Sequence, residues 1–208
     1  QEYYMKYWNA KPRKPYIETE ANYEQLYWPH PISADKVRET AWRAIQSGSY
    51  GYTYGASGIW AMNWEANDGR GWENWSKLSW YEALDLPGSF QMKHLKDFYL
   101  SLDFHQLIPR FNDSAYGRDI DYNKHFLSSY DNKLYIIYSV KGEPLTGYLK
   151  NLRAYSRYTA QWYNPRTGSY HKAAKTLIYP DSQGLHSLPT KPDSNDWVYV
   201  LKFNEKLF

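Results

Sequence analysis

Three glutamates fall within residues 18–24 and could take part in acid–base or nucleophilic chemistry. Residues 15–20 begin apolar and end acidic, which predicts a buried strand with polar residues at its far end. Side chains alternate along a strand, so Glu18 and Glu20 are expected on one face, with Glu24 just beyond. A carboxylate at the end of such a strand is well placed for catalysis. Spacing alone leaves a catalytic carboxylate and a surface carboxylate both open.

Other catalytic and metal-binding patterns are missing from the sequence. No His-x-x-x-His pair occurs, so we expect no metal site and no cofactor. The glycine-rich run at residues 51–58 lacks the lysine and the helix that phosphate binding requires. Cysteine is absent, which excludes disulfides and thiol catalysis and leaves the redox compartment undecided.

Aromatic residues are the outlier of the composition, with 10 Trp and 23 Tyr in 208 residues. Residues 56–79 are predicted to form a long loop. It combines tryptophans with polar residues, namely Trp60, Trp64, Trp72 and Trp75 with Asn63, Glu65, Asp68 and Glu73. A loop of this length in a compact domain is usually functional or disordered, and its aromatic density argues against disorder. Two interpretations of this loop are therefore kept. It could be an aromatic lid packed over the end of the strands, or a surface that stacks on a flat ligand.

Two strand–helix units must position these residues. Strands are predicted at residues 15–20 and 50–55, and helices at residues 33–47 and after Pro87-Gly88. Ser33 or Asp35 can cap the first helix, and Ser47-Gly48-Ser49 ends it. This order is typical of an α/β fold, but two units are too few to close a barrel.

The pattern changes after a polar stretch at residues 112–124. Short strands follow without an amphipathic helix, at residues 133–140, 145–150, 158–163, 169–171, 176–179 and 197–203. Residues 164–168 form a strong turn signal that ends in glycine. We therefore predict two domains, an α/β portion at residues 1–118 and an antiparallel β-sandwich at residues 119–208.

Charge and hydropathy exclude several classes of partner. The net charge is +3 and no long Lys/Arg run occurs, so no nucleic acid is expected, and the basic cluster at residues 11–15 is interpreted as a solvated loop. The sequence contains no stretch of about 20 apolar residues, so no membrane span is predicted. The opening residues 1–4 carry neither an initiator Met nor a signal peptide, which indicates a fragment or a processed chain.

Residues 14–24 (KPYIETEANYE) and residues 37–60 begin an ordered series of motifs. The first resembles the penultimate barrel strand of the apiosidase-like glycoside hydrolases, and the second resembles the last helix–strand unit of that family. Residues 84–95 match its following helix. Residues 161–168 and 196–198 resemble the all-β domain that follows the barrel, a domain sometimes labelled as collagen-binding. The resemblance covers nearly the whole chain.

This resemblance implies the last units of a (β/α)8 TIM barrel, followed by the β-sandwich. It aligns Glu20 with the nucleophile of a retaining glycosidase. Its acid/base partner would come from around the fourth strand, and strands one to six would precede residue 1 or belong to a partner chain. We expect the substrate, a polysaccharide or oligosaccharide, to contact five further residues: Trp60, Tyr54, Tyr23, Tyr52 and Glu24. Tyr52 stands where the family usually has His, which puts the identity of the sugar in doubt. The resemblance also implies a secreted, periplasmic or cell-surface protein.

Two further hypotheses stay open. The chain could be a non-catalytic binding protein whose sandwich holds a carbohydrate or a protein, although residues 130–208 show no patterned row of aromatic residues. Alternatively, the sandwich could be purely structural and brace the barrel. We favour the bracing role for the all-β domain taken alone.

Overall fold

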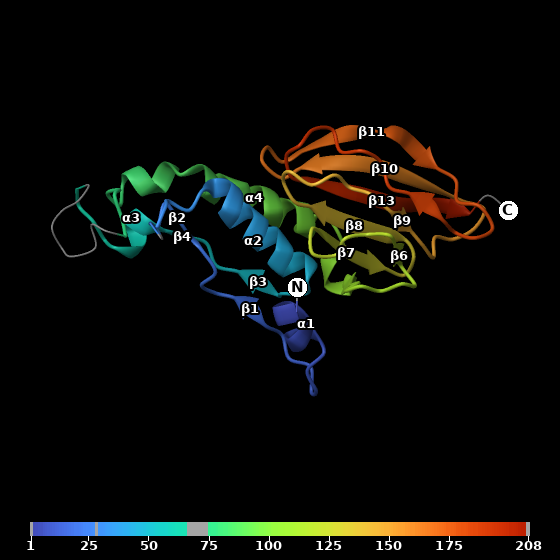
Figure 1. The fold of residues 1–208 in the computed structure, drawn as a ribbon, viewed down its shortest axis with the longest axis horizontal. Coiled ribbons are helices and arrows are strands. Elements are labelled where there is room, and N and C mark those ends of the chain that lie inside the picture. Colours follow the sequence, from blue (N-terminus) through green and yellow to red (C-terminus); the bar gives the residue numbers. More distant parts are fainter. Residues whose placement is uncertain (1, 28, 66–74, 207–208) are drawn as a thin grey trace.

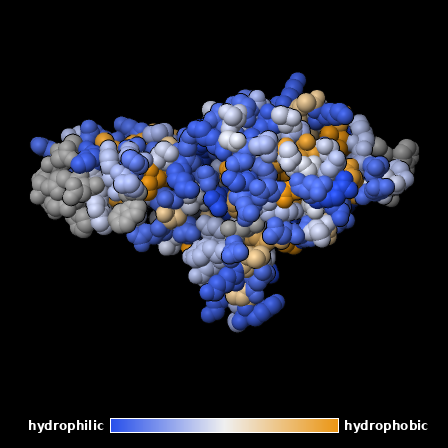
Figure 2. Space-filling model, viewed as in Figure 1, coloured by the Kyte–Doolittle hydropathy of each residue, from blue (hydrophilic) through white to orange (hydrophobic). Residues whose placement is uncertain are grey.

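The computed structural model describes residues 2–27, 29–65 and 75–206. The molecule is elongated, with an α/β part at one end and an all-β part at the other (Figure 1). On the face seen in Figure 2, the surface is mostly hydrophilic, and apolar residues form only small patches. Among the described residues, no helix has the length and apolar character that crossing a membrane would require.

The α/β part contains short parallel strands and two main helices. Its elements are α1 (Glu2–Trp8), β1 (Ile17–Glu18), β2 (Tyr23–Glu24), α2 (Ala34–Gln46), β3 (Gly51–Tyr52), β4 (Gly55–Ala56), α3 (Ser57–Trp60), η1 (Glu82–Asp85), α4 (Pro87–Leu100) and η2 (Phe104–Gln106). Strand β1 pairs in parallel with β3, and β2 pairs in parallel with β4. The loops that follow β1 and β3 therefore leave from the same edge.

Helix α2 forms where the sequence predicts it. The Ser33 side chain accepts a hydrogen bond from the backbone N–H of Lys36 and caps the first turn. One face of the helix buries Val37, Ala41 and Trp42 completely. After Ser47, Gly48 adopts a φ of +92°, a conformation that favours glycine and ends the helix.

Helix α4 begins with Pro87 and packs against α2 (Figure 1). Proline suits the first helical position because the N–H that it lacks would have no helical partner there. Phe98 and Tyr99 are buried, and their ring centroids lie 5.1 and 5.3 Å from that of Trp42. The face of α4 that contains these two buried rings is thus the face that contacts α2.

The all-β part contains only antiparallel pairs. Its strands are β5 (Ile108–Pro109), β6 (Gly117–Arg118), β7 (His125–Tyr130), β8 (Leu134–Ser139), β9 (Tyr148–Leu149), β10 (Ser156–Asn164), β11 (Ser169–Ile178), β12 (His186–Ser187) and β13 (Trp197–Lys206). Six strands form one sheet in the order β11-β10-β13-β8-β7-β5, and three form a second in the order β12-β9-β6. Strands β5 and β6 belong to these sheets although they precede residue 119; the predicted domain boundary stays a prediction.

The six-stranded sheet has a hydrophobic core on each face. One core joins Ile137 and its neighbours to Leu149 of the three-stranded sheet. The other joins Ile136 and Tyr138 to helices α2 and α4, where Tyr138 stacks on Trp42 at 5.6 Å between ring centroids. Strand β8 is therefore buried on both faces, which explains its continuous run of large apolar and aromatic residues.

A buried ion pair also joins the two parts. Arg38 of α2 and Asp196, just before β13, are 1% and 2% exposed. Two guanidinium nitrogens each donate to a separate carboxylate oxygen of Asp196 at 2.8 Å. Tyr138 donates to the same carboxylate at 3.0 Å, and so does Arg166. The α/β part is thus fixed to the sheet by directional bonds as well as by packing.

The structure corrects several predicted elements. Of the strand predicted at residues 145–150, only Tyr148–Leu149 form a strand, β9, which pairs with β12 and β6. The partners of β8 are β7, which the sequence patterns did not reveal, and β13. Residues 169–171 and 176–179 belong largely to one strand, β11.

Residues 57–60 form helix α3 inside the predicted loop. Asp68, Trp72 and Glu73 lie outside the described residues.

The expected mixture of α/β and antiparallel β structure is confirmed. Within the described residues, the parallel strands form two separate pairs.

Candidate functional site

Glu20 lies just after β1, at the edge where parallel strands β1 and β3 end. Its side chain is exposed. A narrow pocket beside it is lined by residues that follow both strands, namely Thr19, Glu20, Asn22, Tyr23, Thr53, Tyr54 and Gly55. Catalytic residues in parallel α/β folds are commonly found at this end of the strands. The predicted buried strand at residues 15–20 is wrong in length and burial, because β1 comprises only Ile17–Glu18, which are exposed and half-buried. Glu20 lies two residues beyond it, and its catalytic role stays a prediction.

Tyr23 connects Glu20 to an aromatic surface. Its hydroxyl donates to Glu20 Oε1 at 3.2 Å. Partial burial and the charge of Glu20 raise the pKa of Tyr23, so its hydroxyl keeps its proton at neutral pH. Gly55 lies against the ring, and a Cβ at that position would overlap Tyr23. The glycine thus permits the approach that brings the Tyr23 hydroxyl to the carboxylate.

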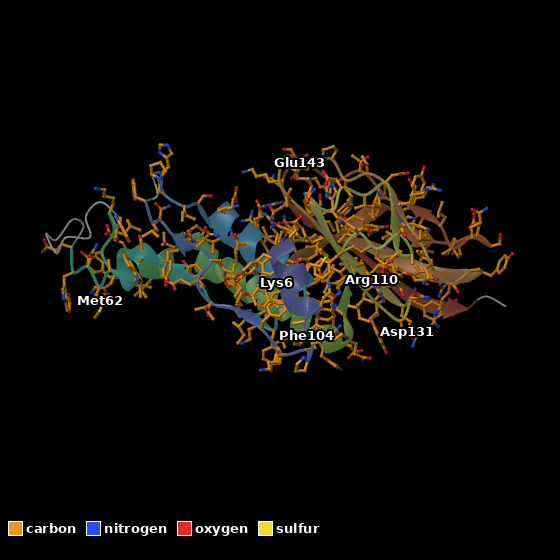
Figure 3. All side chains as sticks on the ribbon, turned by 60° about the horizontal axis from the view of Figure 1, so that its bottom comes forward. Lys6, Met62, Phe104, Arg110, Asp131 and Glu143 are labelled. Carbon is orange, nitrogen blue, oxygen red and sulfur yellow. The ribbon has the colours of Figure 1, made fainter. Side chains whose placement is uncertain are left out.

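Two tryptophans extend this surface at the outer end of the α/β part. The ring of Trp60 lies 5.9 Å from that of Tyr23 and stacks on Trp75 at 6.0 Å with an interplanar angle of 11°. Both tryptophans remain more than one third exposed. Exposed Met62 lies at this same end, in the loop after α3 (Figure 3). Trp75 was noted in the predicted aromatic loop but was not predicted as a substrate contact.

Glu24 is 1% exposed and lies behind this surface. Its Oε2 atom accepts hydrogen bonds from the Tyr54 hydroxyl at 2.8 Å and from the backbone N–H of Gly88 at 3.0 Å. Gly88 is in the first turn of α4. A carboxylate there accepts a hydrogen bond from a backbone N–H that has no partner within the helix, and its charge interacts favourably with the helix dipole. Burial raises the pKa of Glu24, while both hydrogen bonds oppose that rise. Glu24 therefore positions Tyr54 and α4, and a direct substrate contact by Glu24 stays a prediction.

Tyr52 and Glu18 lie in the paired strands themselves. The Tyr52 hydroxyl is buried and has no hydrogen-bond partner among the described residues. Burial, and then the charge of Glu18, raise the pKa of Tyr52. Glu18 Oε2 accepts a hydrogen bond from the Tyr4 hydroxyl of α1 at 3.2 Å. Glu18 therefore has a hydrogen-bond partner of its own in α1.

The arrangement offers a carboxylate, a neutral phenol that donates to it and exposed flat rings. A carboxylate can form a covalent glycosyl intermediate, and aromatic faces can pack against the apolar faces of a sugar. Among residues 2–27, 29–65 and 75–206, no group of three or more His, Asp or Glu side chains is arranged to hold a metal ion. The exposed carboxylate and the flat rings beside it together fit nucleophilic chemistry on a sugar ring.

Two models of known protein families match the chain. The family model described as "Apiosidase-like, catalytic domain" matches residues 1–106, and the chain belongs to this family. A second model, "Putative collagen-binding domain of a collagenase", matches residues 115–202. The first match includes every predicted site residue.

Solved structures of glycoside hydrolases have the same fold. One, described as "Glycoside hydrolase", is 25% identical with a TM-score of 0.76, and the match covers 93% of this chain and 43% of that one. A glycoside hydrolase family 5 protein from Bacteroides vulgatus ATCC 8482 is 22% identical with a TM-score of 0.76, covering 93% and 42%. The chain thus spans less than half the length of these two structures. No curated protein matches it.

Proposed function

We propose that this chain provides the nucleophile of a retaining glycoside hydrolase and that Glu20 is that nucleophile. The observation that carries the proposal is the position of Glu20, exposed at the shared end of two parallel strands with the Tyr23 hydroxyl bonded to it. Family membership supports the reaction class. The Tyr23 hydrogen bond would orient the carboxylate and stabilise its charge between turnovers.

Retention requires a second carboxyl about 5–5.5 Å from the nucleophile, acting first as acid and then as base. Glu18 and Glu24 are poor candidates because each is held by other groups, Tyr4 for the first and Tyr54 with Gly88 for the second. We therefore propose that the partner carboxyl comes from the remainder of a (β/α)8 barrel. Matched structures more than twice as long as this chain support that reading.

The proposed substrate is a polysaccharide or oligosaccharide. Trp60 and Tyr23 would pack against its rings, while Tyr54 and Tyr52 would shape the base of the site. The all-β part, proposed as a β-sandwich, would act as a brace, since Trp42 and Arg38 of α2 are anchored in it. The family resemblance implies a secreted, periplasmic or cell-surface location, and we propose that location for this protein.

The alternative is a binding protein without catalysis, and one comparison separates the two. Hydrolysis of a glycan panel is measured for wild type and Glu20→Gln, expressed from the full open reading frame. The proposal predicts a loss of at least about 10³-fold, because the nucleophile is removed while shape is kept. Glu2→Gln, an exposed carboxylate on α1, is the matched control and should keep full activity. Equal rates for Glu20→Gln and wild type would reject the nucleophile.

A further inference from the structure

A second concave surface lies in the all-β part, where the edges of the two sheets approach each other. It is a groove of about 620 Å³ between the end of β11 and the segment that includes β12. These two strands are the edge strands of the six-stranded and three-stranded sheets. The volume falls within the range of small-ligand sites, about 300–1,000 Å³. Residues 185–190 form one wall and residues 174–179 the other.

The β11 wall departs from regular strand geometry. Thr159 pairs with Leu177 and Gln161 pairs with Lys172, so residues 173–176 stand opposite Ala160 alone. This bulge carries Ala174 and Lys175 into the lining of the groove. Bulges of this kind re-aim side chains and are common beside binding sites. The bulge also interrupts the free edge of β11.

The floor of the groove is polar, neutral and held in place. His186 Nε2 and the Tyr199 hydroxyl are hydrogen-bonded at 2.8 Å, and their rings stack at 5.9 Å between centroids. Burial, and then the charge of Lys175, lower the pKa of His186 to about 4. The imidazole is therefore uncharged at neutral pH, with one ring nitrogen that donates and one that accepts.

The rim combines one flat ring with short hydroxyl side chains. Tyr179 lines the groove and is 56% exposed, which leaves its ring available. Ser187 and Thr190 are also exposed in the lining and can donate or accept hydrogen bonds. A ring face next to hydroxyls and a neutral imidazole suits a ligand with an apolar face and many hydroxyl groups.

We propose that this groove binds a saccharide, stacked on Tyr179 and hydrogen-bonded by His186, Ser187 and Thr190. It would be a second carbohydrate site, separate from the one at Glu20 and independent of catalysis there. An extended peptide is disfavoured because strand addition needs a continuous free edge. Here β11 is interrupted by its bulge, and β12 is only two residues long.

The test is binding of the 208-residue chain to an array of oligosaccharides, with Tyr179→Ala and Thr190→Trp as groove variants. The first removes the stacking ring, and the second fills the groove without removing a buried group. Tyr179→Ala should weaken saccharide binding about tenfold, the size expected for loss of an aromatic contact. Thr190→Trp should weaken it at least as much, because the indole occupies the space that the ligand needs. Tyr179→Phe keeps the ring and should bind normally. Tyr155→Ala is the matched control, because Tyr155 is equally exposed at 56% and lies outside the groove.

Three outcomes would overturn the proposal. The first is that no saccharide binds, or that binding is unchanged in both groove variants. The second is that Glu20→Gln abolishes the binding while the groove variants do not, which would assign it to the candidate active site. The third is that a collagen-like or other extended peptide binds in a Tyr179-dependent manner instead. Failure of the Glu20 nucleophile would leave this groove proposal unaffected.

Discussion

The hydroxyl of Tyr23 donates to Oε1 of Glu20 across 3.2 Å, and this bond links the proposed nucleophile to the aromatic surface beside it. Tyr23→Phe removes the donor and keeps the ring against Trp60. We expect kcat to fall about fivefold to tenfold, since a hydrogen bond to a charged group contributes about 1.5–3 kcal/mol and exposure reduces that value here. Steady-state kinetics on the best glycan measures the change. Tyr155→Phe, in the all-β part, is the control and should not alter kcat. If Tyr23→Phe keeps the wild-type kcat, the Tyr23 hydroxyl does not assist Glu20.

Gly55 permits the contact between Tyr23 and Glu20, because a residue without a Cβ leaves room for the Tyr23 ring. Gly55→Ala places a Cβ within the ring of Tyr23, so the ring must move away from Glu20. The expected loss of kcat is at least as large as that of Tyr23→Phe. Gly51→Ala is the matched control, because its Cβ would make only an ordinary contact of 3.7 Å with Ile17. If both alanine variants keep wild-type kinetics, the close approach of Gly55 has no catalytic consequence.

The buried ion pair between Arg38 and Asp196 should be critical for stability. Asp196→Ala leaves a guanidinium in the core without its main partner, and this should lower the free energy of unfolding by about 3–5 kcal/mol. Chemical denaturation measures the difference. Asp97→Ala breaks an exposed pair with Lys93 on α4 and should change the same quantity far less, because solvent screens that pair. Comparable losses in the two variants would contradict the role assigned to the buried pair.

His186 should make stability depend on pH. Its pKa is about 4 in the folded chain and about 6.5 when unfolded, so the unfolded state binds more protons between these values. The stabilising contribution of neutral His186 is therefore fully present above pH 6.5 and is lost as pH falls toward 4. The free energy of unfolding changes by at most about 1.4 kcal/mol per pH unit from this group. His125, whose pKa burial also lowers, adds to the slope in wild type.

The contribution of His186 is isolated by His186→Gln. Denaturation is measured from pH 4 to pH 7 in wild type and variant, and the difference in slope is compared. The variant should lose less stability than wild type on acidification. Parallel curves would show that His186 keeps its ordinary pKa in the folded protein.

Local signals in the sequence were enough to predict helices α2 and α4. Ser33 at the cap and Gly48 after the end are both short-range features. The turn at residues 164–168 was predicted for the same reason, and Gly168 has a φ of +72° as expected. Glu20 was predicted as the nucleophile from the resemblance of residues 14–24 to a family motif, because the spacing of the glutamates alone could not separate it from Glu18 and Glu24.

Features that depend on distant partners were not predictable in this way. Strand β7 was hidden because it follows a polar stretch and pairs with β8 through tertiary contacts. The role of Glu24 depends on Gly88, 64 residues away, and no local pattern reveals that capping bond. The groove beside Tyr179 likewise arises from a bulge in β11 and from β12, whose two residues carry too little periodicity to detect.

The most direct test of the central claim is to identify the residue that carries the sugar during turnover. A 2-fluoro glycoside, which forms the glycosyl intermediate but slows its hydrolysis, is incubated with the protein from its full open reading frame. Peptide mass spectrometry then locates the added mass. We predict a single label on Glu20, absent in Glu20→Gln. A label on any other carboxylate, in a protein that hydrolyses the same sugar, would contradict the assignment.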